Sequence, residues 1–126
     1  MEKKIIATTN APGAIGPYSQ GISTGELVFT SGQLPINPAD GQIVADDIKK
    51  ATAQSLENVK AILEEAGTDL SKVIKTTVFL KDLADFAPMN EVYGTYFTEN
   101  CPARSCFQVA KLPMDALVEI EVIAVK

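Results

Sequence analysis

Residues 117–125 alternate between two kinds of position, which is typical of a β-strand whose two faces meet different surroundings. One face of this strand is wholly apolar and consists of Val118, Ile120, Val122 and Ala124. The other face mixes two carboxylates with large apolar side chains and consists of Leu117, Glu119, Glu121, Ile123 and Val125. The apolar face indicates a layer of helices packed on it, whereas the mixed face is less polar than a solvated sheet surface. This pattern constrains the chain to a sheet with helices on one side.

The rest of the sequence supplies further strands and the helical layer. β-Branched and aromatic runs bounded by turn residues predict strands at 27–32, 73–80 and 103–109, with a further strand at 3–7. Apolar residues at helical spacing predict one helix from Asp46 or Asp47 to Gly67, and a second that starts at Asp82 or Asp85. The order β-β-α-β-α-β-β predicts an α+β fold, a two-layer sandwich of one β-sheet with two helices on one face. With 126 residues, 46% of them hydrophobic, the chain is expected to form a single domain over residues 1–126.

The last two strands are separated by a short turn at 111–115, so they could pair as an antiparallel hairpin. Alternation puts Arg104 and Cys106 on one face of the strand at 103–109 and Phe107 on the other. In such a hairpin, Arg104, Glu119 and Glu121 could share the face that carries no helix. A half-apolar face without a helix also indicates a partner subunit, with the polar residues in a crevice at the boundary. The alternative is an interfacial salt bridge without chemistry.

Arg104 is the only arginine in the chain, and the chain has no histidine. A guanidinium can bind a carboxylate through two parallel hydrogen bonds, which lysine cannot do. Arg104 is therefore a candidate carboxylate-binding residue, although a plain surface cation is an equal alternative. Without histidine, proton transfer must use carboxylates, tyrosines, thiols, lysines, backbone groups or water.

Composition excludes several classes of function. A net charge of −5 argues against nucleic-acid binding, which needs a clustered basic surface. No apolar run approaches the length of a membrane span, and no secretory signal is visible, so Cys101 and Cys106 are expected to be reduced thiols in a cytoplasmic protein. With no histidine and only these cysteines, no metal site is expected.

Four short motifs together resemble one protein family. They are Gly16-Pro17-Tyr18-Ser19-Gln20, Phe29-Thr30-Ser31-Gly32-Gln33, Lys75-Thr76-Thr77-Val78-Phe79-Leu80 and Pro102-Ala103-Arg104-Ser105-Cys106. In this order, and with the closing strand at 117–125, they resemble the RidA (YjgF-type) proteins, the reactive intermediate or 2-iminopropanoate deaminases. The resemblance runs nearly end to end.

The resemblance implies a chorismate-mutase-like fold and a homotrimer with active sites between subunits. The absence of a nucleic-acid or membrane partner is expected from the composition alone. It implies cofactor-free hydrolysis of 2-enamino and 2-imino acids, made by pyridoxal-phosphate enzymes, to 2-keto acids and ammonia. On the matching positions, Arg104 would bind the substrate carboxylate and Glu119 would position or activate water. The remaining substrate-binding residues would be Tyr18, Ser31 and Asn90, with the backbone at Gly32 and Cys106.

Plainer interpretations exist for several of these residues. The Cys106 thiol has no histidine beside it and is favoured as a packing residue with a backbone role. Ser31 beside Gly32 resembles a catalytic nucleophile, but no Gly-x-Ser-x-Gly motif surrounds it and no base is at hand, so it is not expected to act as one. Tyr18 could be a packing aromatic, and Asn90 a polar residue on the exposed side of its helix.

Two functions other than imine hydrolysis are also compatible with the sequence. One is a regulatory trimer that binds small carboxylates without converting them, and the other is a ribonuclease or translation inhibitor. The acidic composition and the missing histidine count against RNA cleavage. Glu119 distinguishes the deaminase from the regulatory trimer, because a protein that only binds anions gains nothing from a carboxylate beside its ligand.

Overall fold

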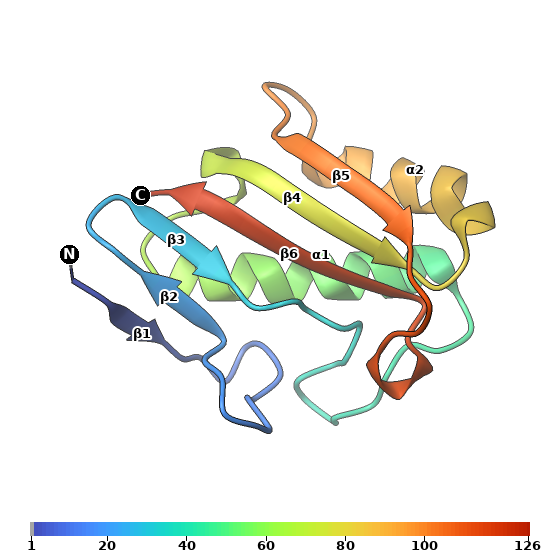
Figure 1. The fold of residues 1–126 in the computed structure, drawn as a ribbon, viewed down its shortest axis with the longest axis horizontal. Coiled ribbons are helices and arrows are strands. Elements are labelled where there is room, and N and C mark those ends of the chain that lie inside the picture. Colours follow the sequence, from blue (N-terminus) through green and yellow to red (C-terminus); the bar gives the residue numbers. More distant parts are fainter. Residues whose placement is uncertain (1) are drawn as a thin grey trace.

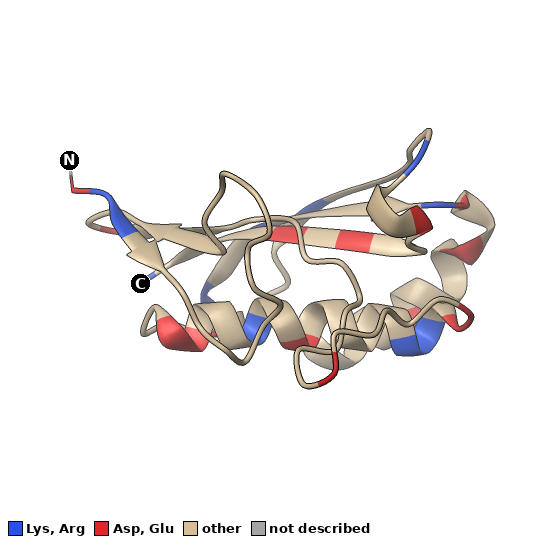
Figure 2. Cartoon of the chain, turned by 90° about the horizontal axis from the view of Figure 1, so that it is seen from below, with Lys and Arg blue, Asp and Glu red and all other residues tan. Residues whose placement is uncertain are grey.

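The computed structural model describes residues 2–126, which form one mixed sheet of six strands and two α-helices (Figure 1). The strands lie in the order β1-β2-β3-β6-β4-β5. Their bounds are β1 Lys4–Ile6, β2 Gly21–Ser23, β3 Leu27–Thr30, β4 Val73–Leu80, β5 Ala103–Gln108 and β6 Val118–Val125. The helices α1 (Ile48–Glu65) and α2 (Phe86–Tyr96) both lie on one face of the sheet (Figure 2). The predicted two-layer α+β fold is confirmed.

Helix α1 begins and ends where the sequence predicts. The Asp47 carboxylate accepts hydrogen bonds from the backbone N–H groups of Lys49 and Lys50, which satisfies donors that the first turn leaves open. Gly67 follows the helix with a φ of 85°, a left-handed conformation that favours glycine. Helix α2 is preceded by a 3₁₀ turn, Leu83–Asp85, and Asp82 rather than Asp85 provides a capping side chain there. No helix within residues 2–126 is long and apolar enough to cross a membrane.

Strand β6 is the centre of the sheet and of the core. It pairs antiparallel with β3 on one side and with β4 on the other. Val118, Ile120 and Ala124 are fully buried under the helices, and Val122 is 2% exposed. Fully burying a side chain such as Val or Ile stabilises a fold by about 1.5–3 kcal/mol, so this apolar face fixes the register of β6.

The predicted hairpin between the last two strands is wrong. Strand β5 lies at the edge of the sheet and pairs in parallel with β4, with Arg104 opposite Thr76. The physical reason is the segment β4-α2-β5, in which a helix connects two parallel neighbours. Strand β6 instead lies between β3 and β4, where both of its edges are hydrogen-bonded.

Strand β2 was not predicted, because its glycine and its three-residue length give only a weak pattern. Gly21 lies so close to α1 that an added Cβ would approach Cγ2 of Ile62 to 2.9 Å. The absence of a side chain therefore lets this strand pack directly over the helix.

Candidate functional site

A pocket of about 710 Å³ brings together four of the predicted site residues. Tyr18, Ser31, Gly32 and Glu119 line it, and much of the remaining lining is apolar, including Ile15 and Met114. Ile15 is 92% exposed and Met114 is 58% exposed in the single chain, so the outer part of this pocket is open. The pocket combines an apolar wall with a few polar groups, which is typical of small-molecule sites.

The carboxyl group of Glu119 packs directly against Gly32. An added Cβ on Gly32 would lie 2.8 Å from Cδ and 2.9 Å from Oε2 of Glu119. Glycine is therefore required at this position for the present placement of the carboxyl group. Burial raises the pKa of Glu119 above its ordinary value, and the negative charge of Glu121 raises it further. A carboxylate with a raised pKa accepts a proton more readily.

The loop at residues 10–20 holds Tyr18 at this pocket, and Gln20 fixes the path of the loop. The Gln20 side chain is buried; its Oε1 accepts from the N–H of Thr8 at 2.7 Å and its Nε2 donates to the carbonyl of Pro12 at 2.7 Å. The Ser31 hydroxyl in turn donates to the carbonyl of Ser19 at 2.6 Å. Gln20 belongs to one of the four sequence motifs, but its role in holding the loop depends on contacts with Thr8 and Pro12 that the motif does not reveal.

A backbone bridge brings the segment 31–32 next to Glu119. The N–H of Gln33 donates to the carbonyl of Ile120 at 2.7 Å, and the N–H of Ile120 donates to the carbonyl of Gln33 at 3.2 Å. Thr30 adds its hydroxyl oxygen as the acceptor for the N–H of Val122 at 3.1 Å. These bonds extend the contact of β3 with β6 beyond the regular strand and fix Gly32 over Glu119.

Arg104 lies in a second group of predicted residues, under α2. Its Nη1 donates to Oδ1 of Asn90 at 2.6 Å, and its Cζ lies 4.7 Å from the ring centroid of Tyr93 and 5.4 Å from that of Phe86. Cys106 is two residues further along β5 and is partly buried. Burial raises the pKa of the Cys106 thiol, which disfavours the thiolate and fits a packing or backbone role.

The expectation that Arg104 and Glu119 share one face of the sheet is wrong. Arg104 is opposite Thr76, and Thr76 is opposite Val122 on the helix-covered face. Glu119 is opposite Phe79 on the face that carries no helix. Because directly paired residues point to the same side, the structure places the two candidate catalytic side chains on opposite faces of one subunit.

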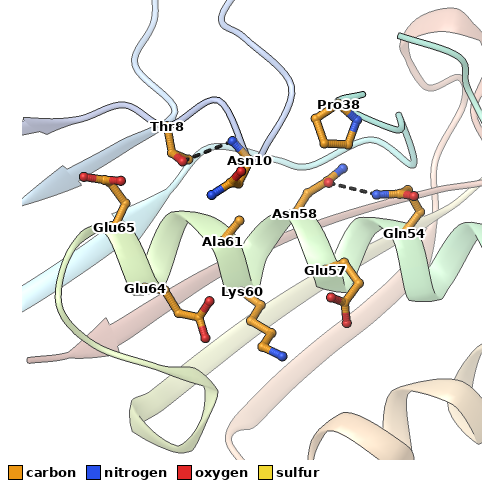
Figure 3. A pocket seen from close by; sticks show the side chains of 10 residues that line it. All are labelled: Thr8, Asn10, Pro38, Gln54, Glu57, Asn58, Lys60, Ala61, Glu64 and Glu65. Carbon is orange, nitrogen blue, oxygen red and sulfur yellow. Dashed lines mark hydrogen bonds between the residues drawn. The ribbon is translucent and has the colours of Figure 1, made fainter. Parts of the chain in front are cut away.

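A further hollow of about 600 Å³ lies between α1 and the segments that carry Thr8, Asn10 and Pro38 (Figure 3). Its polar groups hold the chain together: Gln54 donates to Asn58 at 3.0 Å, and Asn58 donates to the carbonyls of Leu34 and Ile36 at 3.1 and 2.9 Å. Its charged lining contains three glutamates and one lysine. That lining does not suit a carboxylate ligand, and none of the predicted site residues lies in it.

Fold and candidate residues together define a small α+β protein whose partly buried Glu119 and single arginine lie on opposite faces of one sheet. The family profile described as Endoribonuclease L-PSP matches residues 8–126. The 2-iminobutanoate/2-iminopropanoate deaminase of Salmonella typhimurium is 56% identical over 126 residues, which cover 98% of each chain.

Two solved structures are also similar along their whole length. The crystal structure of E. coli TdcF with bound serine has a TM-score of 0.94 and 55% identity, with 98% of both chains covered. The structure of the E. coli YjgF gene product has a TM-score of 0.94 and 52% identity, with 98% of both chains covered. The chain belongs to the endoribonuclease L-PSP family, and its predicted resemblance to the RidA (YjgF-type) proteins is confirmed.

Proposed function

We propose that this protein hydrolyses reactive 2-imino and 2-enamino acids, of the 2-iminopropanoate and 2-aminoacrylate type, to 2-keto acids and ammonia. The observation that carries the proposal is the placement of the Glu119 carboxyl group against Gly32 in a largely apolar pocket, where burial raises the pKa of Glu119. The similarity to a 2-iminobutanoate/2-iminopropanoate deaminase over 98% of the chain supports it.

In the proposed reaction, Glu119 acts as the proton acceptor for water. The oxygen of water forms a bond to C2 of the protonated imine, while one water proton passes to the Glu119 carboxylate. The same proton then passes to the nitrogen of the carbinolamine, and the C–N bond breaks with its electron pair on nitrogen. As C2–O becomes a carbonyl, the hydroxyl proton passes to the Glu119 carboxylate, which gives it to the departing ammonia. One protonated imine and one water thus give one 2-keto acid and one ammonium ion. The electrophile is already reactive, so orientation and one basic group suffice.

Arg104 is proposed to bind the substrate carboxylate through its guanidinium fork. Tyr18, Ser31 and the backbone at Gly32 would complete the half-site around Glu119. Asn90 and the backbone at Cys106 would complete the half-site around Arg104. The Asn90 oxygen contacts Arg104 directly, which supports a role in this half-site over that of an unrelated surface residue.

A substrate with three or four carbons cannot reach both faces of one sheet, so we propose that each active site forms between two copies of the chain. The half-site with Arg104 and the half-site with Glu119 are different surfaces, and such a head-to-tail contact closes into a ring. We propose a homotrimer as that ring. The uncovered face of the sheet supports an interface, because Phe29 is 37% exposed and Phe107 is 45% exposed there.

We propose a cytoplasmic location and no nucleic-acid or membrane partner. The substrates would arise from pyridoxal-phosphate enzymes, and both Cys101 and Cys106 are free thiols, which suits a reducing compartment.

Ammonia release tests the activity. An amino-acid oxidase or a serine or threonine dehydratase would generate the imino acid in the cuvette, and the purified protein should accelerate the formation of ammonia and 2-keto acid. An unchanged rate at saturating protein would overturn the deaminase proposal and favour the regulatory binding protein.

Complementation tests the shared site. Arg104→Ala and Glu119→Gln should each be nearly inactive alone. If each site takes Arg104 from one copy and Glu119 from its neighbour in a ring, about a quarter of the sites should contain both residues after the two variants are mixed in equal amounts and refolded, and activity should return in proportion. Light scattering should report three copies. No recovery in the mixed trimer would refute a site between subunits.

A further inference from the structure

The guanidinium of Arg104 is held from one side by side chains of α2. Its Cζ lies 4.7 Å from the ring centroid of Tyr93 and 5.4 Å from that of Phe86, both within the range in which a cation is attracted to an aromatic face. Its Nη1 donates to Oδ1 of Asn90 at 2.6 Å. Contacts from a single helix therefore hold one donor of the guanidinium and place two aromatic rings against it.

Tyr93 is itself fixed by its surroundings. Its hydroxyl is 2.8 Å from Oγ1 of Thr76, and both side chains are buried. Thr76 is the residue directly opposite Arg104 in the pairing of β4 with β5. The ring of Phe97 packs on Tyr93 with centroids 4.7 Å apart and an interplanar angle of 38°. Tyr93 thus reaches from α2 to β4 with its hydroxyl while its ring supports the neighbouring side chain on β5.

We infer that Tyr93 is the positioning residue of Arg104, and that its anchored ring sets the direction from which a carboxylate can be bound. The inference rests on the proposed function, in which Arg104 binds the substrate carboxylate. A two-bond pair between guanidinium and carboxylate requires the carboxylate to enter in the plane of the guanidinium. The orientation of the Tyr93 ring therefore also determines where C2 of the substrate lies relative to Glu119 of the neighbouring copy.

Because Tyr93 acts through Arg104, substitutions at these two positions should have non-additive effects on carboxylate binding. A lysine at position 104 has a point charge and no plane, so the ring has no fork to orient in Arg104→Lys. Loss of the ring should weaken binding in the wild-type background and have little further effect in the Arg104→Lys background. A general loss of structure would instead weaken both backgrounds equally.

The first measurement is the calorimetric Kd for pyruvate, an unreactive 2-keto acid. Tyr93→Leu should raise this Kd by about tenfold, and Tyr93→Phe, which keeps the ring, by less than about threefold. Leu63→Ala is the control for a general loss of core packing, because it removes a fully buried side chain from α1, and Leu63 takes no part in the contacts described for Arg104 and Tyr93. In imine hydrolysis, Tyr93→Leu should raise KM more than it lowers kcat.

The second measurement uses the fact that the chain has one arginine. In protein labelled with ¹⁵N-arginine, the single Nε–Hε signal must come from Arg104. Its proton shift should carry a ring-current contribution that disappears in Tyr93→Leu and persists in Tyr93→Phe. Pentafluorophenylalanine at position 93 keeps the size of a phenyl ring but reverses its electrostatic character, so it tests the stack even if the leucine variant does not fold. It should weaken pyruvate binding relative to Tyr93→Phe.

An Arg104 signal and a pyruvate Kd that are both unchanged in Tyr93→Leu would overturn the inference. So would an equal loss of affinity in the wild-type and Arg104→Lys backgrounds. Absence of imine hydrolysis by the wild-type protein would instead overturn the proposed function. The arginine spectrum does not depend on turnover, so the two failures are distinguishable.

Discussion

Gly32→Ala should lower catalysis without lowering stability. An alanine Cβ at this position would lie 2.8 Å from Cδ of Glu119, whereas ordinary van der Waals contact begins at 3.4 Å. The carboxyl group must therefore withdraw by about 0.6 Å to restore ordinary contact, the difference between these two distances. The atoms in conflict are the far end of a flexible side chain, so the fold can adapt while the position of the carboxylate changes.

A misplacement of about 1 Å in an active site can cost about a hundredfold in rate, so we expect kcat/KM for imine hydrolysis to fall roughly ten- to a hundredfold in Gly32→Ala. The free energy of unfolding should stay the same or rise slightly, since replacing a glycine in a permitted conformation restricts the unfolded chain and stabilises by about 0.4–1 kcal/mol. The assay is steady-state ammonia release, paired with thermal unfolding of the same preparation.

Gly25→Ala is the matched control for this experiment. Gly25 lies between β2 and β3, and no heavy atom lies within 4 Å of its added Cβ. This variant should keep full activity. Wild-type kcat/KM in Gly32→Ala would refute the argument that the close approach of Gly32 places the Glu119 carboxylate for catalysis.

Four further predictions concern the charged residues of the candidate site and the absence of RNA cleavage. Glu119→Gln should lower kcat on the order of tenfold or more while the calorimetric Kd for pyruvate holds, and an unchanged kcat would remove Glu119 from the mechanism. The ionised carboxylate of Glu119 is the active form, so kcat/KM should fall as the pH falls through the raised pKa of Glu119. Glu121→Gln removes a neighbouring negative charge that raises this pKa, so in a pH–rate profile of this variant the fall in kcat/KM should occur at lower pH. Arg104→Lys should lower kcat/KM roughly ten- to a hundredfold, because losing one charge-assisted hydrogen bond costs about 1.5–3 kcal/mol; wild-type kinetics would show that charge alone suffices. Purified protein should not cleave RNA, and nuclease activity that co-purifies in constant ratio and vanishes in Arg104→Ala would contradict this.

Local patterns predicted the elements well, because each of them is decided by a few neighbouring residues. The alternation in 117–125 identified the buried face of β6, and Asp47 and Gly67 marked the ends of α1. Alternation also grouped Arg104 with Cys106, which the structure confirms through their partners Thr76 and Val78.

The neighbours of each strand could not be predicted in the same way. The side of the sheet assigned to Arg104 depended on which strand β5 would pair with, and no residue of β5 encodes that choice. The same limit applies to Tyr93, which the sequence shows only as an aromatic residue on the apolar side of a helix. Its contact with Arg104 depends on the register that places Thr76 opposite the arginine.

The central position of β6 has a consequence for folding during synthesis. Strands β3 and β4 are both made long before β6, yet both need β6 as their antiparallel neighbour. Until residues 118–125 have left the ribosome, the sheet remains in two parts with unpaired inner edges, and α1 has no complete surface to cover. The nascent chain therefore carries exposed strand edges until β6 emerges, and this strand, which follows the other five of the sheet in chain order, joins the two parts.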